Sequence, residues 1–201
     1  MATVVIPFAG AEGKTRLHES RRVRRALAQA MFCDVLAAGV LVGRTRVVTP
    51  DDEAAEAAGD AGAEAIPDPE RGQGAAVQAG LEGLSPDGIL VVNADVPCVV
   101  PHDLRSLLEA TPPGGLALVE ALDGTTNALS LPAAAAFAPL YGPSSADRFR
   151  AHAESLGLET VSVALPNLVE DIDTMDDLTR LQLRAGPRTQ ACLAELERSL
   201  V

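Results

Sequence analysis

Short runs of apolar residues alternate along the chain with longer segments in which apolar residues recur every three or four positions. The short runs predict β-strands, and the longer segments predict helices that bury one face. The predicted strands cover residues 3–7, 44–50, 63–68, 88–95, 115–122, 127–132 and 158–165. The predicted helices cover residues 19–39, 51–58, 72–84, 101–110 and 144–157, with two C-terminal helices, one beginning after Thr174 and one at 187–201.

The predicted strands are almost continuously apolar, which is typical of strands buried on both faces. The run Ile-Leu-Val-Val at residues 89–92 is the clearest, because polar residues follow it abruptly. Alternation of such strands with helices predicts an α/β fold, a parallel sheet with helices on both faces. The chain shows no repeat, low-complexity segment or linker, so we expect one domain over residues 1–186 and an appended helix at 187–201.

The composition excludes several classes of function. The 201 residues include 28 acidic and 16 basic side chains, and the net charge of −12 would repel the phosphate backbone of a nucleic acid. No apolar run is long enough to cross a membrane, and the N-terminus lacks the features of a signal peptide. Three widely spaced cysteines fit neither a disulfide framework nor a zinc site. We therefore expect a cytoplasmic protein with small-molecule partners, and neither nucleic acid nor membrane among them.

The only lysine of the chain, Lys14, lies in the glycine-rich stretch G-A-E-G-K-T-R-L after the first predicted strand. Backbone N–H groups of such a loop, together with an ammonium group, can bind a polyphosphate. The stretch nearly matches a P-loop, but Phe8 stands where that motif needs its first glycine. Two interpretations are open at this point, a phosphate-binding loop of another kind and a surface loop with a solvated lysine.

Carboxylates follow two of the predicted strands. Ligands of open parallel sheets bind beyond the carboxyl ends of the strands, and Asp95 lies at the end of the clearest one. Asp171 and Asp173 stand two residues apart after the last strand, so in extended chain both face one side. Such carboxylates can ligate Mg²⁺, which prefers oxygen ligands. They also have structural explanations, since Asp95 can cap a turn and Asp173 precedes Thr174, a good helix N-cap.

Two other stretches are rich in small hydrogen-bond donors. Residues 124–127 read Gly-Thr-Thr-Asn, and Gly142, Ser144 and Ser145 stand at the start of a predicted helix. Either stretch could bind a small phosphorylated or carboxylated anion. Ser144 is equally explained as a helix cap, because Asp147 follows three residues later in the pattern of a capping box.

Together these stretches resemble one enzyme family. The chain carries, in order, G-K-T-R-L, N-A-D-V-P, G-T-T-N-A-L, Y-G-P-S-S-A-D-R-F and D-I-D-T-M-D-D-L, over residues 3–181. This combination resembles the 2-phospho-L-lactate and phosphoenolpyruvate guanylyltransferases of deazaflavin coenzyme F-420 biosynthesis. The resemblance implies a single-domain, Rossmann-like nucleotidyltransferase fold of the nucleotide-diphospho-sugar transferase type, with a mostly parallel mixed sheet. It also implies Mg²⁺-dependent transfer of GMP from GTP to a three-carbon phosphate ester, with release of pyrophosphate.

The resemblance assigns roles to residues of the glycine-rich stretches. Lys14, and with it Arg16, would hold the triphosphate of GTP, and Lys14 would act in catalysis. Gly72 and Gly74 lie in the stretch that would meet the guanine base. The chain departs from many members at two places, because Phe8-Ala9 replaces a second lysine and Gly74 replaces an asparagine.

The resemblance also assigns the metal and acceptor sites. Asp95 would be catalytic and would hold Mg²⁺ together with Asp171 or Asp173. The positions that match the family's acceptor site are Thr126, Gly142 and Ser145.

Several alternatives remain open from the sequence. A related nucleotidyltransferase could use another NTP or another acceptor, such as 3-phosphoglycerate or a molybdenum-cofactor precursor. A non-catalytic nucleotide-binding protein could have kept the fold, although the presence of Lys14, Asp95 and Asp171 argues against this. The apolar C-terminal stretch at 191–196 could take part in a homodimer.

Overall fold

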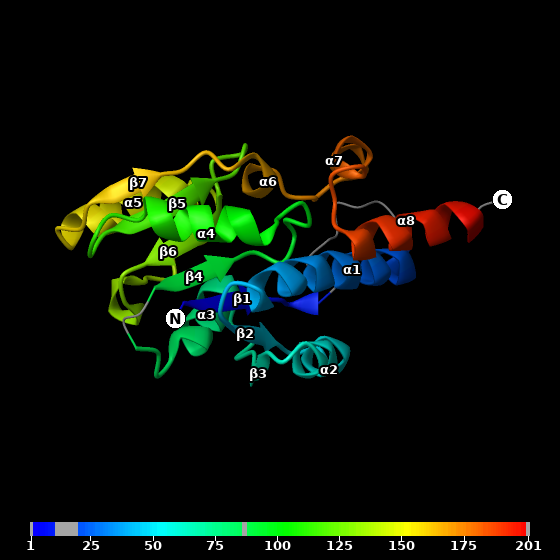
Figure 1. Ribbon diagram of the computed structural model, residues 1–201, viewed down its shortest axis with the longest axis horizontal. Helices are drawn as coiled ribbons and strands as arrows, with labels where there is room; N and C mark the ends of the chain where they lie inside the picture. Colours follow the sequence, from blue (N-terminus) through cyan, green and yellow to red (C-terminus); the bar gives the residue numbers. More distant parts are fainter. Residues whose placement is uncertain (1, 11–19, 86–87, 200–201) are drawn as a thin grey trace.

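The computed structural model describes residues 2–10, 20–85 and 88–199. In this part of the chain, seven strands form one sheet in the order β3-β2-β1-β4-β6-β5-β7 (Figure 1). β1 lies between β2 and β4 and is parallel to both, with Thr3 beside Arg44 on one side and Ile89 on the other. The strands are β1 (Thr3–Pro7), β2 (Arg44–Thr49), β3 (Glu64–Pro67), β4 (Ile89–Val92), β5 (Leu116–Glu120), β6 (Thr126–Leu131) and β7 (Thr160–Ser162).

β6 is antiparallel to both of its neighbours, β4 and β5, whereas the other described strand pairs are parallel. The expectation of an entirely parallel sheet is therefore wrong at β6, and the mostly parallel mixed sheet implied by the family resemblance is confirmed. The cause is the short β5–β6 connection, in which Gly124 takes a φ of 81°. A connection this short can join only antiparallel strands.

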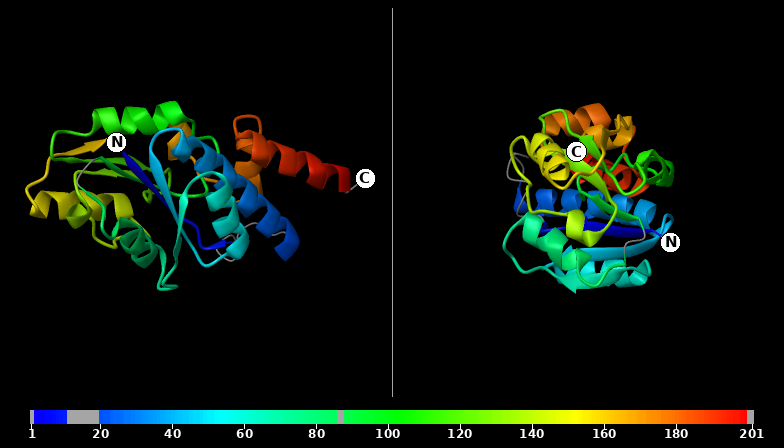
Figure 2. Two further views of the ribbon diagram at one scale, coloured as in Figure 1. Left: turned by 60° about the horizontal axis from the view of Figure 1, so that its bottom comes forward. Right: turned by 90° about the vertical axis from the view of Figure 1, so that its left-hand side faces the viewer.

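Helices cover both faces of the sheet, as predicted, and Figure 2 shows α4 and α5 on opposite sides of the strands. β1 illustrates the two layers, because Val4 and Ile6 belong to one buried core and Val5 to the other. Each fully buried aliphatic side chain of this kind stabilises the fold by roughly 1.5–3 kcal/mol. The first core packs under α1 (Arg21–Val40), α2 (Asp52–Asp60), α4 (Pro101–Ala110) and α6 (Pro166–Val169), and the second under α3 (Gln73–Leu81) and α5 (Ser145–Ser155).

Three helices follow the last strand instead of the two expected, namely α6, α7 (Met175–Leu181) and α8 (Pro187–Ser199). α6 is a single turn and carries no periodic pattern that could predict it. Thr174 caps α7 as predicted, since its Oγ1 accepts a hydrogen bond from the backbone N–H of Asp177 at 3.2 Å. None of the described helices combines the length and hydrophobicity of a membrane span.

The apolar face of α8 packs within the chain. Its residues Cys192, Leu193 and Leu196 lie against a buried cluster that includes Leu27 and Met31 of α1. Figure 1 shows the two helices side by side. The homodimer suggested by this stretch stays a prediction, and its apolar residues are already used inside the chain.

The capping box expected at Ser144 is absent. Ser144 adopts a left-handed backbone conformation with a φ of 55°, and its side chain makes no capping hydrogen bond. A tight turn causes this, because the carbonyl of Gly142 accepts a hydrogen bond from the N–H of Ser145 at 3.0 Å. An N-cap needs an extended backbone, which this turn does not allow.

A buried carboxylate attaches α8 to α1. Asp34 of α1 is 5% exposed, and its oxygens accept hydrogen bonds from the backbone N–H groups of Arg188 at 3.0 Å and Thr189 at 2.9 Å. N–H groups in the first turn of a helix have no partner within that helix, so Asp34 caps α8 from another helix. Gly186 permits this approach, because a Cβ atom there would lie 2.3 Å from the carboxyl carbon of Asp34.

We predict that Asp34→Ala lowers the free energy of unfolding by about 2–3 kcal/mol, because two buried N–H donors lose a charged acceptor. Ser20→Ala is the control, since Ser20 caps the exposed start of α1 through one hydrogen bond of 3.3 Å and its loss should cost about 1 kcal/mol or less. Urea unfolding of the two variants measures both values. Equal losses would contradict the buried cap.

Candidate active site

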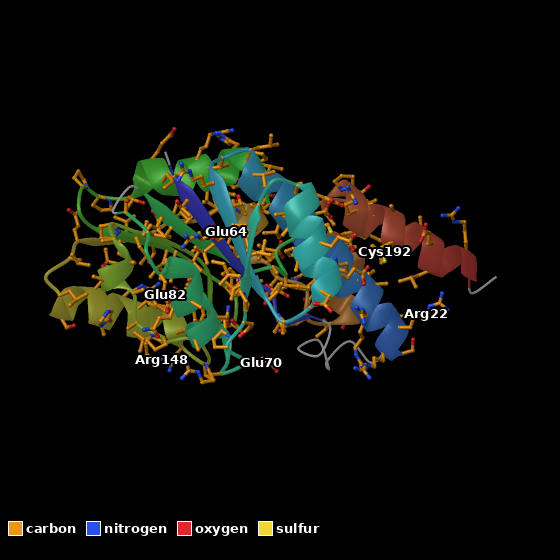
Figure 3. The ribbon with its side chains drawn as sticks, turned by 90° about the horizontal axis from the view of Figure 1, so that it is seen from below. Arg22, Glu64, Glu70, Glu82, Arg148 and Cys192 are labelled. Carbon is orange, nitrogen blue, oxygen red and sulfur yellow. The ribbon has the colours of Figure 1, made fainter. Side chains whose placement is uncertain are left out.

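A cleft of about 700 Å³ opens at the carboxyl ends of β1, β2 and β4. The sheet grows in two directions from β1, toward β2 on one side and β4 on the other, and ligands of open α/β sheets bind at such a switch point. Glu70, labelled in Figure 3, lies on the wall of the cleft in the loop between β3 and α3. The described cleft residues with polar side chains are Arg21, Arg25, Asp51, Asp68, Glu70, Gln73, Asn93, Asp95 and Asp173.

Three carboxylates from two distant parts of the sequence meet beside this cleft, and two of them, Asp95 and Asp173, line it. Asp95 follows β4, and Asp171 and Asp173 lie on the extended segment between α6 and α7. Each contributes an oxygen atom that lies within 4.8 Å of one from each of the others. The backbone brings them together, because the N–H of Ile172 donates to the carbonyl oxygen of Asp95 at 3.0 Å and the Ile172 side chain is fully buried. Residues on either side of Ile172 therefore face the same way.

The geometry of this carboxylate cluster fits a divalent cation. Like charges at this separation repel by on the order of 3 kcal/mol per pair at an effective dielectric of about 20. Oxygen atoms on opposite sides of a bound Mg²⁺ lie roughly 4 Å apart, similar to the spacing here. All three residues are partly exposed, and a cation in the cleft can reach Asp95 and Asp173, which line it.

Asp177, in the first turn of α7, keeps its charge beside this cluster. Its burial raises the pKa, but hydrogen bonds from Thr174 and from the backbone of Asp173, together with Arg180, outweigh burial and lower the pKa of Asp177 below its ordinary value. The group is therefore ionised at neutral pH. The sequence pattern predicts Thr174 as the cap of this helix but gives no sign of a role for Asp177.

A network of side-chain amides begins at the cleft with Gln73 and Asn93 and continues behind it. The Nε2 of Gln73 at the start of α3 donates to the Oδ1 of Asn93 at 2.7 Å. The Nδ2 of Asn93 donates to the carbonyl of Thr126 at 3.1 Å. The Nδ2 of Asn93 also lies 3.5 Å from the Oδ1 of Asn127, and the Nδ2 of Asn127 donates to the carbonyl of Leu168 in α6 at 2.9 Å. Gln73 lies within the stretch 72–76 that the family resemblance places near the base, and Asn93 lies in the strand-end stretch that also holds Asp95, but the sequence pattern assigns neither residue a role of its own.

The glycines predicted to meet the base lie at the start of α3. Gly72 lines the cleft, and its φ of 87° belongs to the region that favours glycine. Gly74 packs so closely on Pro139 that a Cβ atom there would lie 2.5 Å from the Cβ of Pro139 and 2.9 Å from its Cα. Any side chain at this position, including the asparagine expected from the family resemblance, would need the backbone at Pro139 to move.

The structure brings the three predicted acceptor residues together. The Oγ of Ser145 donates to the Oγ1 of Thr126 at 3.1 Å, and the turn from Gly142 leads directly into Ser145. Both hydroxyl groups are buried, with exposures of 0% and 1%. Among the described residues, these three do not line the cleft themselves, but Asn93, which does, bonds to the carbonyl of Thr126.

The predicted triphosphate ligands Lys14 and Arg16 lie outside the described residues. Two other cationic residues line the cleft at the start of α1, Arg21 and Arg25. Arg25 is ion-paired with Asp51 at 3.4 Å and with Glu53 on the exposed side. Basic side chains therefore stand on the wall of the cleft in a strongly acidic protein.

Comparison with known proteins extends these observations. A family model described as the MobA-like NTP transferase domain matches residues 15–162. A phosphoenolpyruvate guanylyltransferase of Streptosporangium roseum is 37% identical over 206 residues, covering 96% of this chain and 91% of that protein. One of Conexibacter woesei is 36% identical, covering 87% and 83%. A candidate nucleotide-diphospho-sugar transferase from Desulfovibrio desulfuricans G20 superposes with a TM-score of 0.75 at 16% identity, covering 98% of this chain and 95% of the other.

The structural likeness, at this low identity, supports the fold alone, and the nucleotidyltransferase fold implied by the sequence resemblance is confirmed. The sequence matches go further, because two relatives above 30% identity align with most of the chain. The chain therefore belongs to the phosphoenolpyruvate guanylyltransferase family and contains a MobA-like NTP transferase domain.

Proposed function

We propose that this protein transfers GMP from GTP to phosphoenolpyruvate, or to a closely related three-carbon phosphate ester, and releases pyrophosphate as a step of coenzyme F-420 biosynthesis. The observation that carries the proposal is the cluster of Asp95, Asp171 and Asp173, two of which line the cleft, in a chain whose curated relatives are named phosphoenolpyruvate guanylyltransferases. Three free cysteines suit a reducing compartment, so we place the reaction in the cytoplasm.

The reaction is a substitution at the α-phosphorus of GTP. An oxygen atom of the acceptor's phosphate attacks this phosphorus in line, a new P–O bond forms, and the bond to the β-phosphate breaks as pyrophosphate leaves. The acceptor phosphate is already ionised at neutral pH, so the attack needs no general base. The protein then has to bring two anions together and offset their charge.

We propose that Asp95, Asp171 and Asp173 hold Mg²⁺, since they offer the oxygen ligands it prefers at a suitable spacing. When bound, Mg²⁺ offsets the negative charge of phosphate oxygens. Asp95 is the central member, because it follows β4 directly and its carbonyl group fixes the segment that carries the other two.

Cationic side chains of the chain would bind the triphosphate. We propose Lys14 and Arg16 for this role on the family resemblance, with Lys14 also stabilising the charge that develops on the leaving pyrophosphate. Arg21 and Arg25 support a triphosphate site in the cleft, because both place guanidinium groups on its wall.

We propose that the guanine base lies against the start of α3. Gly72 leaves this wall open, and Gln73 presents an amide group whose Nε2 is used by Asn93. Its Oε1 is then directed by this contact and can accept a hydrogen bond from the amino group of guanine, which adenine does not offer at that position. Gln73 would thereby supply the amide group that position 74 lacks, because Pro139 leaves no space there for a side chain.

We propose that the acceptor binds beside Asn93, near Thr126, Gly142 and Ser145. The hydrogen bond from Asn93 to Thr126 connects this region with the cleft. Because the hydroxyl groups of Thr126 and Ser145 are buried and bonded to each other, we expect them to fix the backbone of this wall.

Asp95→Asn should abolish most of the turnover with the fold intact. Loss of a residue that only orients a metal ligand typically lowers activity roughly 10- to 100-fold. Loss of Asp95, a direct ligand in this proposal, should lower the rate of pyrophosphate release by more than that. The measurement is pyrophosphate release with saturating GTP, Mg²⁺ and phosphoenolpyruvate, with thermal unfolding as the control for folding. Near-normal turnover in the variant would show that Asp95 is not a metal ligand.

Gln73→Leu should raise the KM for GTP about 3- to 10-fold and reduce the preference for GTP over ATP, since one neutral hydrogen bond to the base is lost. Gln78→Leu makes the same change on an exposed position of α3 away from the cleft and should leave both quantities unchanged. Steady-state kinetics with both nucleotides test this. An unaltered preference in Gln73→Leu would place the base elsewhere.

The substrate assignment is tested by incubating the protein with each of the four NTPs and with phosphoenolpyruvate, 2-phospho-L-lactate or 3-phosphoglycerate. We expect pyrophosphate release with GTP and one of the first two acceptors. Release with CTP, or with 3-phosphoglycerate alone, would identify a related nucleotidyltransferase. Tight GTP binding without release under any condition would identify a non-catalytic nucleotide-binding protein.

A further inference from the structure

The segment that carries Asp171 and Asp173 is fastened along its length. We refer to residues 166–174 as the strap, which runs from α6 to the cap of α7. Hydrogen bonds or ion pairs hold its members to five other parts of the chain, namely α4, β6, the segment after β4, α7, and Arg184 between α7 and α8. The strap residues with such contacts are Pro166, Asn167, Leu168, Val169, Glu170, Ile172, Asp173 and Thr174.

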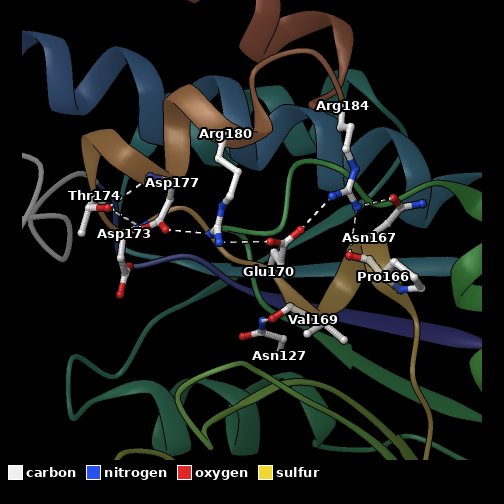
Figure 4. A network of polar contacts seen from close by, with 10 residues as sticks. All are labelled: Asn127, Pro166, Asn167, Val169, Glu170, Asp173, Thr174, Asp177, Arg180 and Arg184. Carbon is white, nitrogen blue, oxygen red and sulfur yellow. Dashed lines mark hydrogen bonds and ion pairs between the residues drawn. The ribbon is translucent and has the colours of Figure 1, made fainter.

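One carboxylate, that of Asp177, organises the end of the strap beside the cleft. Its Oδ2 accepts hydrogen bonds from the backbone N–H groups of Asp173 at 3.3 Å and Thr174 at 2.9 Å, and from the Thr174 hydroxyl at 2.7 Å. Figure 4 shows the side chain of Asp173 directed away from Asp177 while its backbone faces it. The contact therefore sets the direction of a proposed metal ligand without competing for its carboxylate.

Arg180 links this end of the strap to its middle. Its guanidinium group donates to the Oδ1 of Asp177 at 2.9 Å and pairs with the Oε1 of Glu170 at 3.3 Å. Glu170 is 18% exposed and also pairs with Arg184 at 2.7 Å, and Arg184 donates to the carbonyl of Pro166 at 3.1 Å (Figure 4). In the sequence, Asp171 and Asp173 therefore lie between Glu170 and Asp177, and Arg180 contacts both of these flanking carboxylates.

We propose that Asp177 is a positioning residue, which with Arg180 holds Asp171 and Asp173 directed at Asp95 before a cation binds. This inference rests on the proposed function, in which these three carboxylates hold the metal ion. Their mutual repulsion would separate them in a mobile segment, so a cation would have to draw the strap in at a cost in affinity. A strap that is already fixed avoids this cost, in the way that outer-sphere partners of metal ligands do.

The charge and the ion pair that Asp177 supplies at the start of a helix are the competing explanation for its role, and the chain contains a control for both. Asp147 occupies the same position in α5, third after the N-cap, and pairs with Arg150 three residues later at 2.7 Å, as Asp177 pairs with Arg180 at 2.9 Å. Asp147 is 79% exposed and belongs neither to the cleft nor to the strap. Both changes remove a helix-start charge and an ion pair, and only one disturbs the strap.

The test measures Mn²⁺ binding to the full chain in the absence of nucleotide. The electron paramagnetic resonance signal of the free ion reports how much Mn²⁺ stays unbound. Asp177→Asn should raise the Kd for Mn²⁺ about 10- to 100-fold, and Asp147→Asn should leave it unchanged. In turnover, Asp177→Asn should raise the Mg²⁺ concentration for half-maximal rate by a similar factor and leave the KM for GTP at saturating Mg²⁺ unaltered. Arg180→Gln, which keeps the contacts of Asp177 with Thr174, should raise the Mn²⁺ Kd less and in the same direction.

The outcomes separate this inference from the proposed reaction. An unchanged Mn²⁺ Kd in Asp177→Asn and Arg180→Gln, or an equal rise in Asp147→Asn, would overturn the positioning role. Mn²⁺ binding that survives Asp95→Asn, or no Mn²⁺ binding by the wild-type chain, would overturn it as well. Failure to release pyrophosphate from GTP would instead refute the proposed reaction, and the Mn²⁺ result would stand by itself.

Discussion

Negative charge on Asp95, Asp171 and Asp173 pushes these side chains apart, and the fold has to hold them together. Their oxygens lie within 4.8 Å of one another, on a chain whose net charge is already −12. The backbone hydrogen bond from Ile172 to Asp95 and the buried Ile172 side chain supply the first constraint. In the proposed function, a divalent cation is the occupant that turns this repulsion into attraction, and the phosphates of a nucleotide bind to that cation.

The rest of the fold arranges the cleft around this carboxylate cluster. β4 beside β1 delivers Asp95 to the point where the sheet changes its direction of growth. The amide network from Gln73 through Asn93 and Asn127 connects the start of α3 with α6, the first part of the strap. The proposed base wall and the proposed metal site are thereby parts of one hydrogen-bonded structure, so a shift at one of them is resisted by the other.

The sequence predicted the parts of this arrangement that depend on short-range patterns. The strand-end position of Asp95 and the two-residue spacing of Asp171 and Asp173 were sufficient to propose a shared site, because strand ends converge at one edge of a sheet. The antiparallel β6 was missed, although the Asp-Gly turn before it is a hairpin signal. Contacts between distant residues had no local signature. The cap on α8 from Asp34 and the tight packing of Gly74 on Pro139 belong to this class.

Anomalous diffraction from a crystal of the protein with Mn²⁺ and GTP would test the central claim most directly. The account predicts an anomalous peak between the carboxylates of Asp95, Asp171 and Asp173, within bonding distance of oxygen atoms of the triphosphate. A Mn²⁺ peak bound to GTP elsewhere in the cleft, with the three carboxylates making no contact to it, would contradict the account.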